Sequence, residues 1–140
     1  ASIVTRGNVF AIEINRDMVA RITHEAEEGH IDNLHPLWGD IEIAGGTKLG
    51  DASVDVVVLS NILFQIDDKP GALKEAFRVL KNGGRLLLVD WQESFGGLGP
   101  APHHVFNKET AEPLITKIGF TKLSDNLPAG EHHYAILFKK

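Results

Sequence analysis

The fold is decided by residues 54–90, which read VDVVVLSNILFQIDDKPGALKEAFRVLKNGGRLLLVD. Residues 54–59 and 85–90, at the two ends of this segment, are apolar at nearly every position, which is typical of parallel strands covered by helices on both faces. Between them, apolar residues recur at the helical spacing i, i+3, i+4 and i+7, namely Leu73, Ala76, Phe77 and Leu80. The segment therefore predicts a central strand, a crossover helix that ends at Asn82-Gly83-Gly84, and a second buried strand.

A further strand and helix precede this unit. Residues 9–14 form a short run rich in β-branched residues, and apolar residues then follow at helical spacing: Met18, Val19, Ile22 and Ala26. Asn15 can accept the free amide hydrogens at the start of a helix, and Gly29 can supply the left-handed residue that ends one. We therefore expect a helix over residues 16–28.

The next two segments are a short strand and, further along, a long loop. Residues 33–38 predict a strand that contains Pro36, and proline cannot donate a hydrogen bond to a neighbouring strand. We place this strand at a sheet edge. The loop over residues 91–107 is rich in glycine and proline and is long for a connection, which is often a sign of function.

The C-terminal part predicts a helix and a hairpin. Pro113 is tolerated in the first turn of a helix, so we expect the third helix to begin near Thr110. Residues 120–127 and 133–138 flank Pro128-Ala129-Gly130, which is typical of a turn between antiparallel strands. The fold class is thus α/β: one open sheet, mostly parallel with a C-terminal antiparallel hairpin, in a single domain over residues 1–140.

Composition narrows the range of partners. The net charge is -5 without a cluster of Lys and Arg, which argues against a nucleic-acid partner and favours a small molecule. The apolar runs are far shorter than the roughly 20 residues that cross a bilayer, so we expect no membrane span and a cytoplasmic protein. The chain has no cysteine, which excludes disulfides, thiol nucleophiles and zinc–thiolate sites within it.

Three segments carry a resemblance to a known family: VFAIEI at 9–14, WGD at 38–40 with SVDVVVLSN at 53–61, and AFRVLKNGGRL at 76–86. They resemble class I S-adenosylmethionine-dependent methyltransferases, especially the small-molecule branch related to quinone-biosynthesis methyltransferases. The third segment usually has a proline at the position of Asn82. The resemblance implies a Rossmann-like sheet, S-adenosyl-L-methionine as cofactor, and methyl transfer to a small molecule by in-line displacement.

The resemblance also implies a cofactor site. Glu13, at the end of its strand, corresponds to the acidic residue that binds the ribose hydroxyls, and Asp40 to the carboxylate at the adenine amino group. A carboxylate suits both groups, since each presents hydrogen-bond donors. The predicted cofactor-binding residues are Glu13, Ile14, Asp40, Ile41, Leu59, Ser60 and Asn61, the last three because ligands bind beyond the carboxyl ends of such strands. Ser60 and Asn61 are equally typical of residues that cap a following turn.

The groups that could remove a proton from the acceptor lie after the second buried strand: Asp90, Glu93, His103 and His104. The sequence does not choose among them. Adjacent histidines on an extended segment point in opposite directions, so the pairs His103-His104 and His132-His133 predict no metal site.

The chain departs from the family at its beginning. The first strand and its Gly-x-Gly loop are missing, and residues 1–5 read as the last turn of the helix that follows that loop. Residues 96–99 cannot substitute, because they follow the wrong strand and lead to prolines. The missing strand belongs between the strands at 9–14 and 54–59. These two edges could be covered by direct pairing of the two strands, by a second copy of the chain or by a further segment of the same protein, and we favour the last.

Two other functions remain open. A degenerate, non-catalytic methyltransferase that serves as an interaction module would also lack the glycine loop. An NAD-dependent oxidoreductase would also use an acidic residue at the second strand, but Tyr134, the one tyrosine, has no lysine four residues later.

Overall fold

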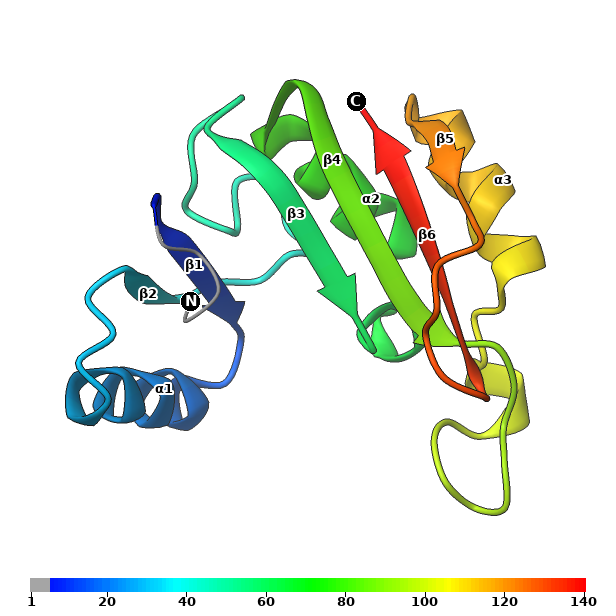
Figure 1. Cartoon of the computed structure of the whole chain (residues 1–140), viewed down its shortest axis with the longest axis horizontal. Coiled ribbons are helices and arrows are strands. Elements are labelled where there is room, and N and C mark those ends of the chain that lie inside the picture. The colour runs from blue at the N-terminus through cyan, green and yellow to red at the C-terminus, as the bar shows by residue number, and fades with distance from the viewer. Residues whose placement is uncertain (1–5) are drawn as a thin grey trace.

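The computed structural model describes residues 6–140, and the expected helical turn at residues 1–5 lies outside the described residues. Strands and helices alternate along much of the chain, with two places where one strand follows another directly (Figure 1). In order, the elements are β1 (Val9–Glu13), α1 (Arg16–Glu28), β2 (Leu34–Trp38), β3 (Val54–Ser60), η1 (Leu63–Gln65), α2 (Lys69–Val79), β4 (Leu80–Trp91), η2 (Pro102–His104), α3 (Lys108–Ile118), β5 (Thr121–Ser124) and β6 (His133–Lys139), where η marks short 3-10 turns.

The described strands form two sheets. β1 and β2 pair in parallel, and the second sheet has the order β3-β4-β6-β5. In that sheet β3 and β4 are parallel, while β6 is antiparallel to both of its neighbours. These pairings confirm the adjacent parallel strands, the edge position of β2 and the C-terminal antiparallel pair. Two parallel pairs and a hairpin thus form an α/β architecture.

The expected open edge of β3 is confirmed for the described residues, whereas the expected burial of both its faces is wrong. β3 lies at one edge of its sheet, and β1 is not hydrogen-bonded to it. Its Val56 and Val58 side chains are 55% and 58% exposed, so helices do not cover both faces of this strand. The apolar run predicted burial, but burial on the second face depends on a neighbouring layer that residues 6–140 do not supply.

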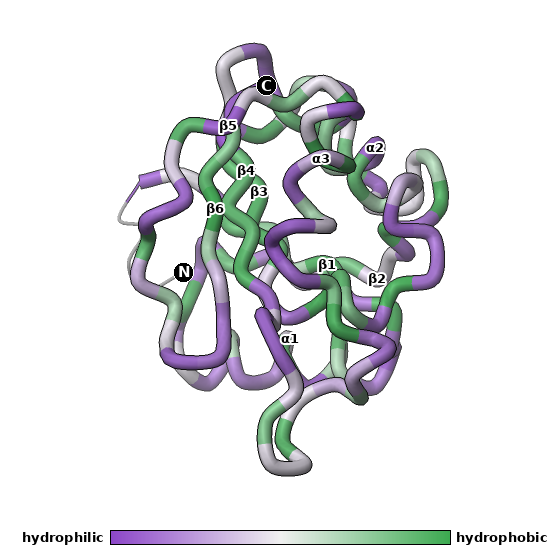
Figure 2. Tube along the Cα trace, turned by 90° about the vertical axis from the view of Figure 1, so that its right-hand side faces the viewer, coloured by the Kyte–Doolittle hydropathy of each residue, from purple (hydrophilic) through white to green (hydrophobic). Residues whose placement is uncertain are grey.

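The core lies between the four-stranded sheet and two helices, α2 and α3, which cover one of its faces (Figure 1). Alternate residues of β4 point into it, so Leu86 and Leu88 are fully buried. The tube in Figure 2 is correspondingly apolar along much of β3, β4 and β6. Each fully buried leucine or phenylalanine stabilises the fold by about 1.5–3 kcal/mol. The largest such apolar side chains are Leu63, Leu73, Leu80, Leu86, Leu88, Ile115, Phe120, Ile136 and Phe138.

Helix ends were partly predicted. The bounds of α1 are as expected, and the Asn15 side chain accepts hydrogen bonds from the backbone N–H groups of Asp17 and Met18 at 2.9 and 3.2 Å. Gly29, however, has φ −80°, and the next residue, His30, takes the left-handed conformation with φ 49°. The end of the helix is therefore as expected, but the residue that turns the chain is different.

The start of α3 differs from the prediction. The helix begins at Lys108 rather than near Thr110, and Pro113 lies inside it. The side chain of Asn107 caps the helix by accepting the Thr110 N–H at 3.1 Å. This cap outweighs Pro113, whose ring removes one backbone donor from the helix.

The end of α2 and the start of β4 also differ from the prediction. α2 ends at Val79, and the Asn82-Gly83-Gly84 segment, expected to end the helix as a turn, already belongs to β4. Gly83 and Gly84 pair there with the C-terminal residue: Gly83 N–H donates to the Lys140 carbonyl and Lys140 N–H to the Gly84 carbonyl, both at 3.0 Å. Long-range backbone pairing thus extends the strand into a segment that locally resembles a turn.

Candidate functional site

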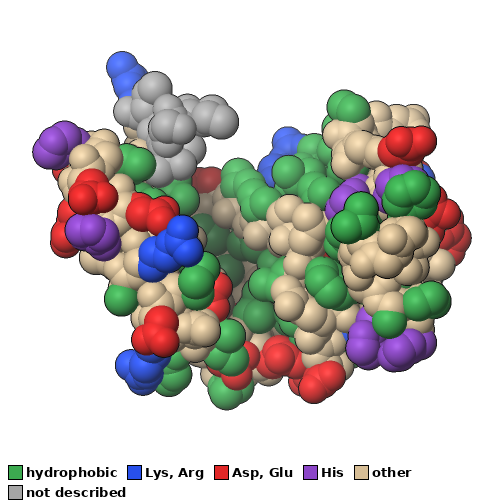
Figure 3. Space-filling model, turned by 90° about the horizontal axis from the view of Figure 1, so that it is seen from below, with side chains coloured by type: hydrophobic (Ala, Val, Ile, Leu, Met, Phe, Trp, Pro, Cys, Tyr) green, Lys and Arg blue, Asp and Glu red, His purple; other side chains and the backbone are tan. Residues whose placement is uncertain are grey.

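The carboxyl ends of the parallel strands open on the same side of the molecule. Glu13 lies opposite Trp38 at the ends of β1 and β2, and Ser60 lies opposite Val89 at the ends of β3 and β4. In Figure 1 the arrowheads of β1, β3 and β4 point downward, and Figure 3 views the molecule from below. The surface there is hollowed between the two sheets, and apolar side chains line the hollow (Figure 3).

Glu13 is half-buried at the end of β1, and one side of its carboxylate is already held. Its Oε1 accepts the Asn15 N–H at 2.8 Å, while Oε2 makes no hydrogen bond within residues 6–140. The next residue, Ile14, is 59% exposed. A carboxylate fixed through one oxygen and open at the other can accept hydrogen bonds from a ligand.

Trp38, the last residue of β2, is hydrogen-bonded to the chain just after β1. Its indole Nε1–H donates to the Ile14 carbonyl at 2.9 Å. The Arg16 guanidinium carbon lies 3.8 Å from the centroid of the indole ring, a cation–π distance. The ring therefore links the end of β2 to the turn between β1 and α1.

Asp40 stands at the start of a tight loop over residues 40–51. Its N–H donates to the Gly46 carbonyl at 3.2 Å, and its Oδ1 accepts the Glu42 N–H at 2.9 Å. Asp40 Oδ2 has no hydrogen-bond partner among the described residues. A Cβ atom at Gly46 would lie 1.9 Å from the Asp40 carbonyl oxygen, so the loop requires glycine there. Ile41 packs against the hydrophobic core.

An ion pair in α2, between the buried Glu75 and the partly buried Arg78, holds this loop, and no pattern in the sequence predicted it. The carboxylate of Glu75 is 2.7 Å from Arg78 Nη2, and Glu75 also accepts a hydrogen bond of 2.6 Å from the Thr47 hydroxyl. The Arg78 guanidinium, with smaller contributions from Thr47 and Gly45, lowers the pKa of Glu75 to about 2 despite the opposing effect of burial. The available signal was an acidic residue among the apolar, buried positions of α2, namely Ala72, Leu73, Ala76 and Val79.

The end of β3 presents Ser60 and Asn61 but not the side chain of Leu59. Leu59 is 3% exposed and belongs to the core. Ser60 and Asn61 are exposed, and Asn61 adopts a left-handed conformation with φ 54°. Neither side chain caps the following turn, η1, whose cap residue is Ile62. The capping role expected as an alternative is therefore not seen, and the ligand role stays a prediction.

The side chain of Asp90, rather than that of Ser60 or Asn61, binds the start of η1. It is fully buried, and its two carboxylate oxygens accept the N–H groups of Leu63 at 2.9 Å and Trp91 at 2.8 Å. Burial raises the pKa of Asp90, and backbone hydrogen bonds oppose that rise. This geometry favours a structural role for Asp90 over that of a base acting on a bound acceptor.

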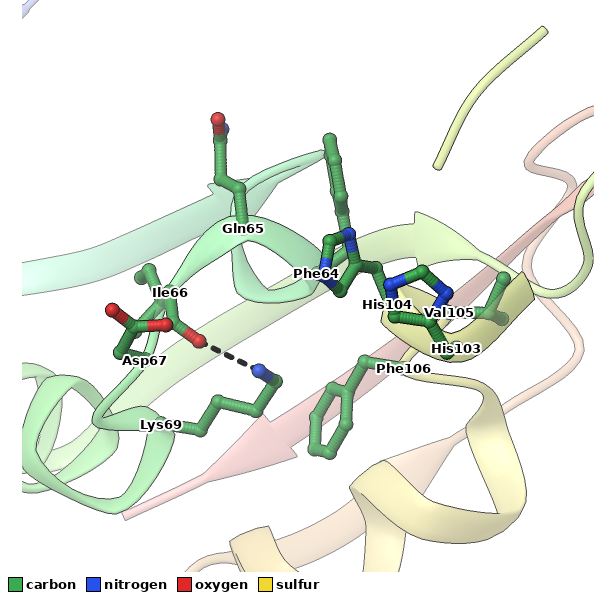
Figure 4. A pocket seen from close by; sticks show the side chains of 9 residues that line it. All are labelled: Phe64, Gln65, Ile66, Asp67, Lys69, His103, His104, Val105 and Phe106. Carbon is green, nitrogen blue, oxygen red and sulfur yellow. Dashed lines mark hydrogen bonds between the residues drawn. The ribbon is translucent and has the colours of Figure 1, made fainter. Parts of the chain in front are cut away.

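His103 and His104 line a cavity of about 400 Å³ between η1 and η2 (Figure 4). Their ring centroids lie 4.1 Å apart. Lys69 lies across the cavity and donates to the Ile66 carbonyl at 2.6 Å, the dashed line in Figure 4. The lining residues are Phe64, Gln65, Ile66, Asp67, Lys69, His103, His104, Val105 and Phe106.

The remaining base candidate lies elsewhere. The exposed Glu93 carboxylate is 2.9 Å from Nδ1 of His132, and Glu93 does not line this cavity. Within residues 6–140, no group of three or more His, Asp or Glu side chains is arranged to hold a metal ion. No helix in the same described part of the chain is long and apolar enough to span a membrane.

Comparison with known families and relatives points in one direction. The profile of a family described as "Methyltransferase domain" matches residues 1–88. An arsenite methyltransferase from Aquipseudomonas alcaligenes is 31% identical over 88 residues, which are 60% of this chain and 25% of that protein. The ubiquinone/menaquinone biosynthesis C-methyltransferase of Vibrio campbellii is 32% identical over 89 residues, 63% of this chain and 33% of the relative. The chain thus spans only a quarter to a third of the length of these two relatives.

A solved structure shares the fold. The crystal structure of a SAM-dependent methyltransferase from Aquifex aeolicus superimposes with a TM-score of 0.85 at 19% sequence identity. The alignment covers 97% of this chain and 70% of that one. At this level of identity the likeness extends to the fold alone.

Proposed function

Because the chain belongs to the S-adenosylmethionine-dependent methyltransferases, we propose that it takes part in methyl transfer to a small molecule. We propose that the adenosine part of the cofactor binds in the hollow between the two sheets, at the carboxyl ends of the strands. One observation carries the proposal. Glu13 ends β1 and Asp40 lies just past the end of its parallel partner β2; both carboxylates are half-buried, and each has one oxygen that accepts a backbone N–H.

The donor and acceptor chemistry fits the cofactor. The open oxygen of Glu13 would accept hydrogen bonds from the ribose hydroxyls, and that of Asp40 from the adenine amino group. Ile14 and Ile41 would flank the base with apolar surface, and Ser60 and Asn61 would lie toward the reactive methyl. Leu59 would contribute through its backbone, because its side chain is in the core.

We place the acceptor in the cavity beside His103 and His104. When bound, S-adenosylmethionine would supply a methyl group on a sulfonium sulfur for in-line displacement by a nucleophilic atom of the acceptor, with S-adenosylhomocysteine as the leaving group. The task of the protein is to hold the acceptor in line and to exclude water from it. Where the acceptor must lose a proton, one of the two histidine rings that line the cavity would receive it, because a neutral imidazole nitrogen is a proton acceptor.

The relatives differ in what they methylate, and the residues of this chain favour one kind of acceptor. The chain has no cysteine, so it offers no thiolate for a soft centre such as trivalent arsenic. The cavity instead presents aromatic rings and aliphatic side chains with a few polar groups, which suits an organic molecule.

We further propose that an additional strand completes the site between β1 and β3. Both strands have an edge that is unpaired within the described residues, and such edges invite pairing. A segment of the same protein is our first choice for the partner and a second copy of the chain our second. A homodimer at micromolar concentration, measured by light scattering, would favour the second copy.

Calorimetry on the protein expressed from its complete gene tests the proposal. We expect S-adenosylhomocysteine to bind and NADH not to bind. Glu13→Ala should weaken binding by about 1–3 kcal/mol, the range for leaving buried hydrogen-bonding groups unpaired. Asp17→Ala is the matched control, because Asp17 is an exposed carboxylate four residues away. Binding of neither ligand would instead favour the non-catalytic interaction module, and binding of NADH the oxidoreductase.

A further inference from the structure

We propose that Glu75 and Arg78 of α2 are positioning residues for the adenine end of the cofactor site. They hold the loop over residues 40–51 and thereby fix Asp40. This inference rests on the proposed function, because it requires that Asp40 contact the adenine.

Glu75 is dedicated to this loop. The residue is 2% exposed, and its carboxylate accepts three hydrogen bonds from the loop: from Gly45 N–H at 2.9 Å, Thr47 N–H at 3.2 Å and the Thr47 hydroxyl at 2.6 Å. Arg78 donates the rest, through Nε at 2.8 Å and Nη2 at 2.7 Å. A buried carboxylate is costly to desolvate, so its retention requires that all these partners be in place.

Arg78 also binds residues nearer the end of the loop. Its Nη1 pairs with the Asp51 carboxylate, and its Nη2 donates to the Leu49 carbonyl at 2.9 Å. The ion pair therefore contacts the loop at four residues between positions 45 and 51. A second attachment lies at the start of α2, where the Asp68 N–H donates to Glu42 Oε1 at 2.6 Å.

The path from the ion pair to Asp40 is short and runs through close backbone contacts. Gly45 and Thr47 flank Gly46, whose carbonyl accepts the Asp40 N–H at 3.2 Å. The two backbones are in close contact, since a Cβ at Gly39 would lie 2.5 Å from the Gly46 carbonyl oxygen. A displacement of Gly46 would consequently displace the backbone that carries the Asp40 carboxylate.

The stability of the fold does not by itself explain why an ion pair occupies this position. Replacing a buried ion pair by apolar residues of similar volume is often neutral or stabilising. Apolar side chains could fill the space beside the loop, but they could not bind chosen N–H and carbonyl groups and so fix the loop in one conformation. The pair supplies that directional restraint.

The test separates positioning from general destabilisation. Calorimetry compares two ligands on the protein expressed from its complete gene: S-adenosylhomocysteine and its analogue with hydrogen in place of the adenine amino group. Glu75→Gln should weaken the first by about tenfold and the second by less than about twofold, because only the first uses Asp40. Arg78→Lys, which keeps the charge but loses the bidentate geometry, should act in the same direction.

Val79→Ala is the matched control, since Val79 is buried in the same helix but its side chain does not bond the loop. This variant should lower the melting temperature and leave the ratio of the two affinities unchanged. Hydrogen exchange of the unliganded protein gives an independent readout. Glu75→Gln should speed exchange at residues 40–51 by a larger factor than in β4, whose exchange reports only the change in global stability.

The outcomes distinguish the positioning role of Glu75 from the adenine contact of Asp40. Asp40→Asn is expected to weaken S-adenosylhomocysteine selectively. If it does and Glu75→Gln does not, the positioning role is overturned and the proposed function stands. If Glu75→Gln weakens both ligands equally, the positioning role is likewise overturned. If Asp40→Asn has no effect, the adenine contact and the positioning role both fail.

Discussion

The indole of Trp38 donates a hydrogen bond of 2.9 Å to the backbone carbonyl of Ile14, joining the end of β2 to the residue after Glu13. Glu13 and Asp40 would contact different parts of one ligand, so the distance between their strand ends matters. This bond ties the two ends together on the side of the molecule where the hollow lies.

Trp38→Phe should therefore weaken S-adenosylhomocysteine binding by about 0.5–1.5 kcal/mol, the typical net contribution of one hydrogen bond. Calorimetry measures the effect. Arg16→Gln serves as the control, because it removes the cation–π contact but leaves the indole N–H in place. An unchanged affinity of Trp38→Phe would show that the hydrogen bond from Trp38 to Ile14 does not contribute to ligand binding.

The acid stability of the protein should depend on Glu75. Its pKa is lowered from 4.5 to about 2 in the folded chain, so the unfolded chain binds this proton first as the pH falls. The stabilisation is thus complete above about pH 4.5 and is lost as the pH falls toward 2, with a total of up to about 3 kcal/mol. Urea unfolding should show that the difference in free energy of unfolding between wild type and Glu75→Gln is smaller at pH 3.5 than at pH 6. A constant difference would contradict the linkage.

Tyr134 should anchor the loop that carries the two cavity histidines. Its buried hydroxyl donates to the Phe106 carbonyl at 2.7 Å. Tyr134→Phe leaves that carbonyl unpaired and should lower the free energy of unfolding by about 1–2 kcal/mol at pH 7, measured by urea unfolding.

The same residue predicts an alkaline dependence. Burial, reinforced by the charges of Asp90 and Glu109, raises the pKa of Tyr134 above its ordinary value. A raised pKa means that the tyrosine contributes stability below pH 10, and this contribution is lost as the pH rises further. Wild type should lose stability above pH 10 more steeply than Tyr134→Phe; parallel curves would refute this.

The histidine pair should matter for turnover rather than for folding. Both His103 and His104 are exposed, so replacing each by Gln should change the melting temperature little. If the acceptor loses a proton to one of them, the double variant should lower kcat by about 10²-fold or more, as for loss of a general base. Asp90→Asn is the contrasting variant: it should mainly lower the melting temperature, because Asp90 supports η1. Unchanged kcat in the double histidine variant would exclude both rings as the base.

Local patterns in the sequence determined most of the elements. The bounds of α1 followed from the Asn15 cap and the helical spacing after it, since both act within a few residues. The edge position of β2 followed from Pro36, which lacks an N–H. The placement of Glu13 and Asp40 at one edge could also be predicted, because parallel strands end on the same side of a sheet.

Only the tertiary structure decided which charged groups are buried and what they hold. Glu75 and Thr47 are 28 residues apart, as are Tyr134 and Phe106, and no local pattern relates them. Asp90 was a plausible base by its position, yet the fold turns its carboxylate toward the N–H groups of η1. The apolar run of β3 could not reveal that one of its faces is exposed. Propensities and caps depend on neighbours in the chain, whereas burial, pairing and charge compensation depend on segments that meet only after folding.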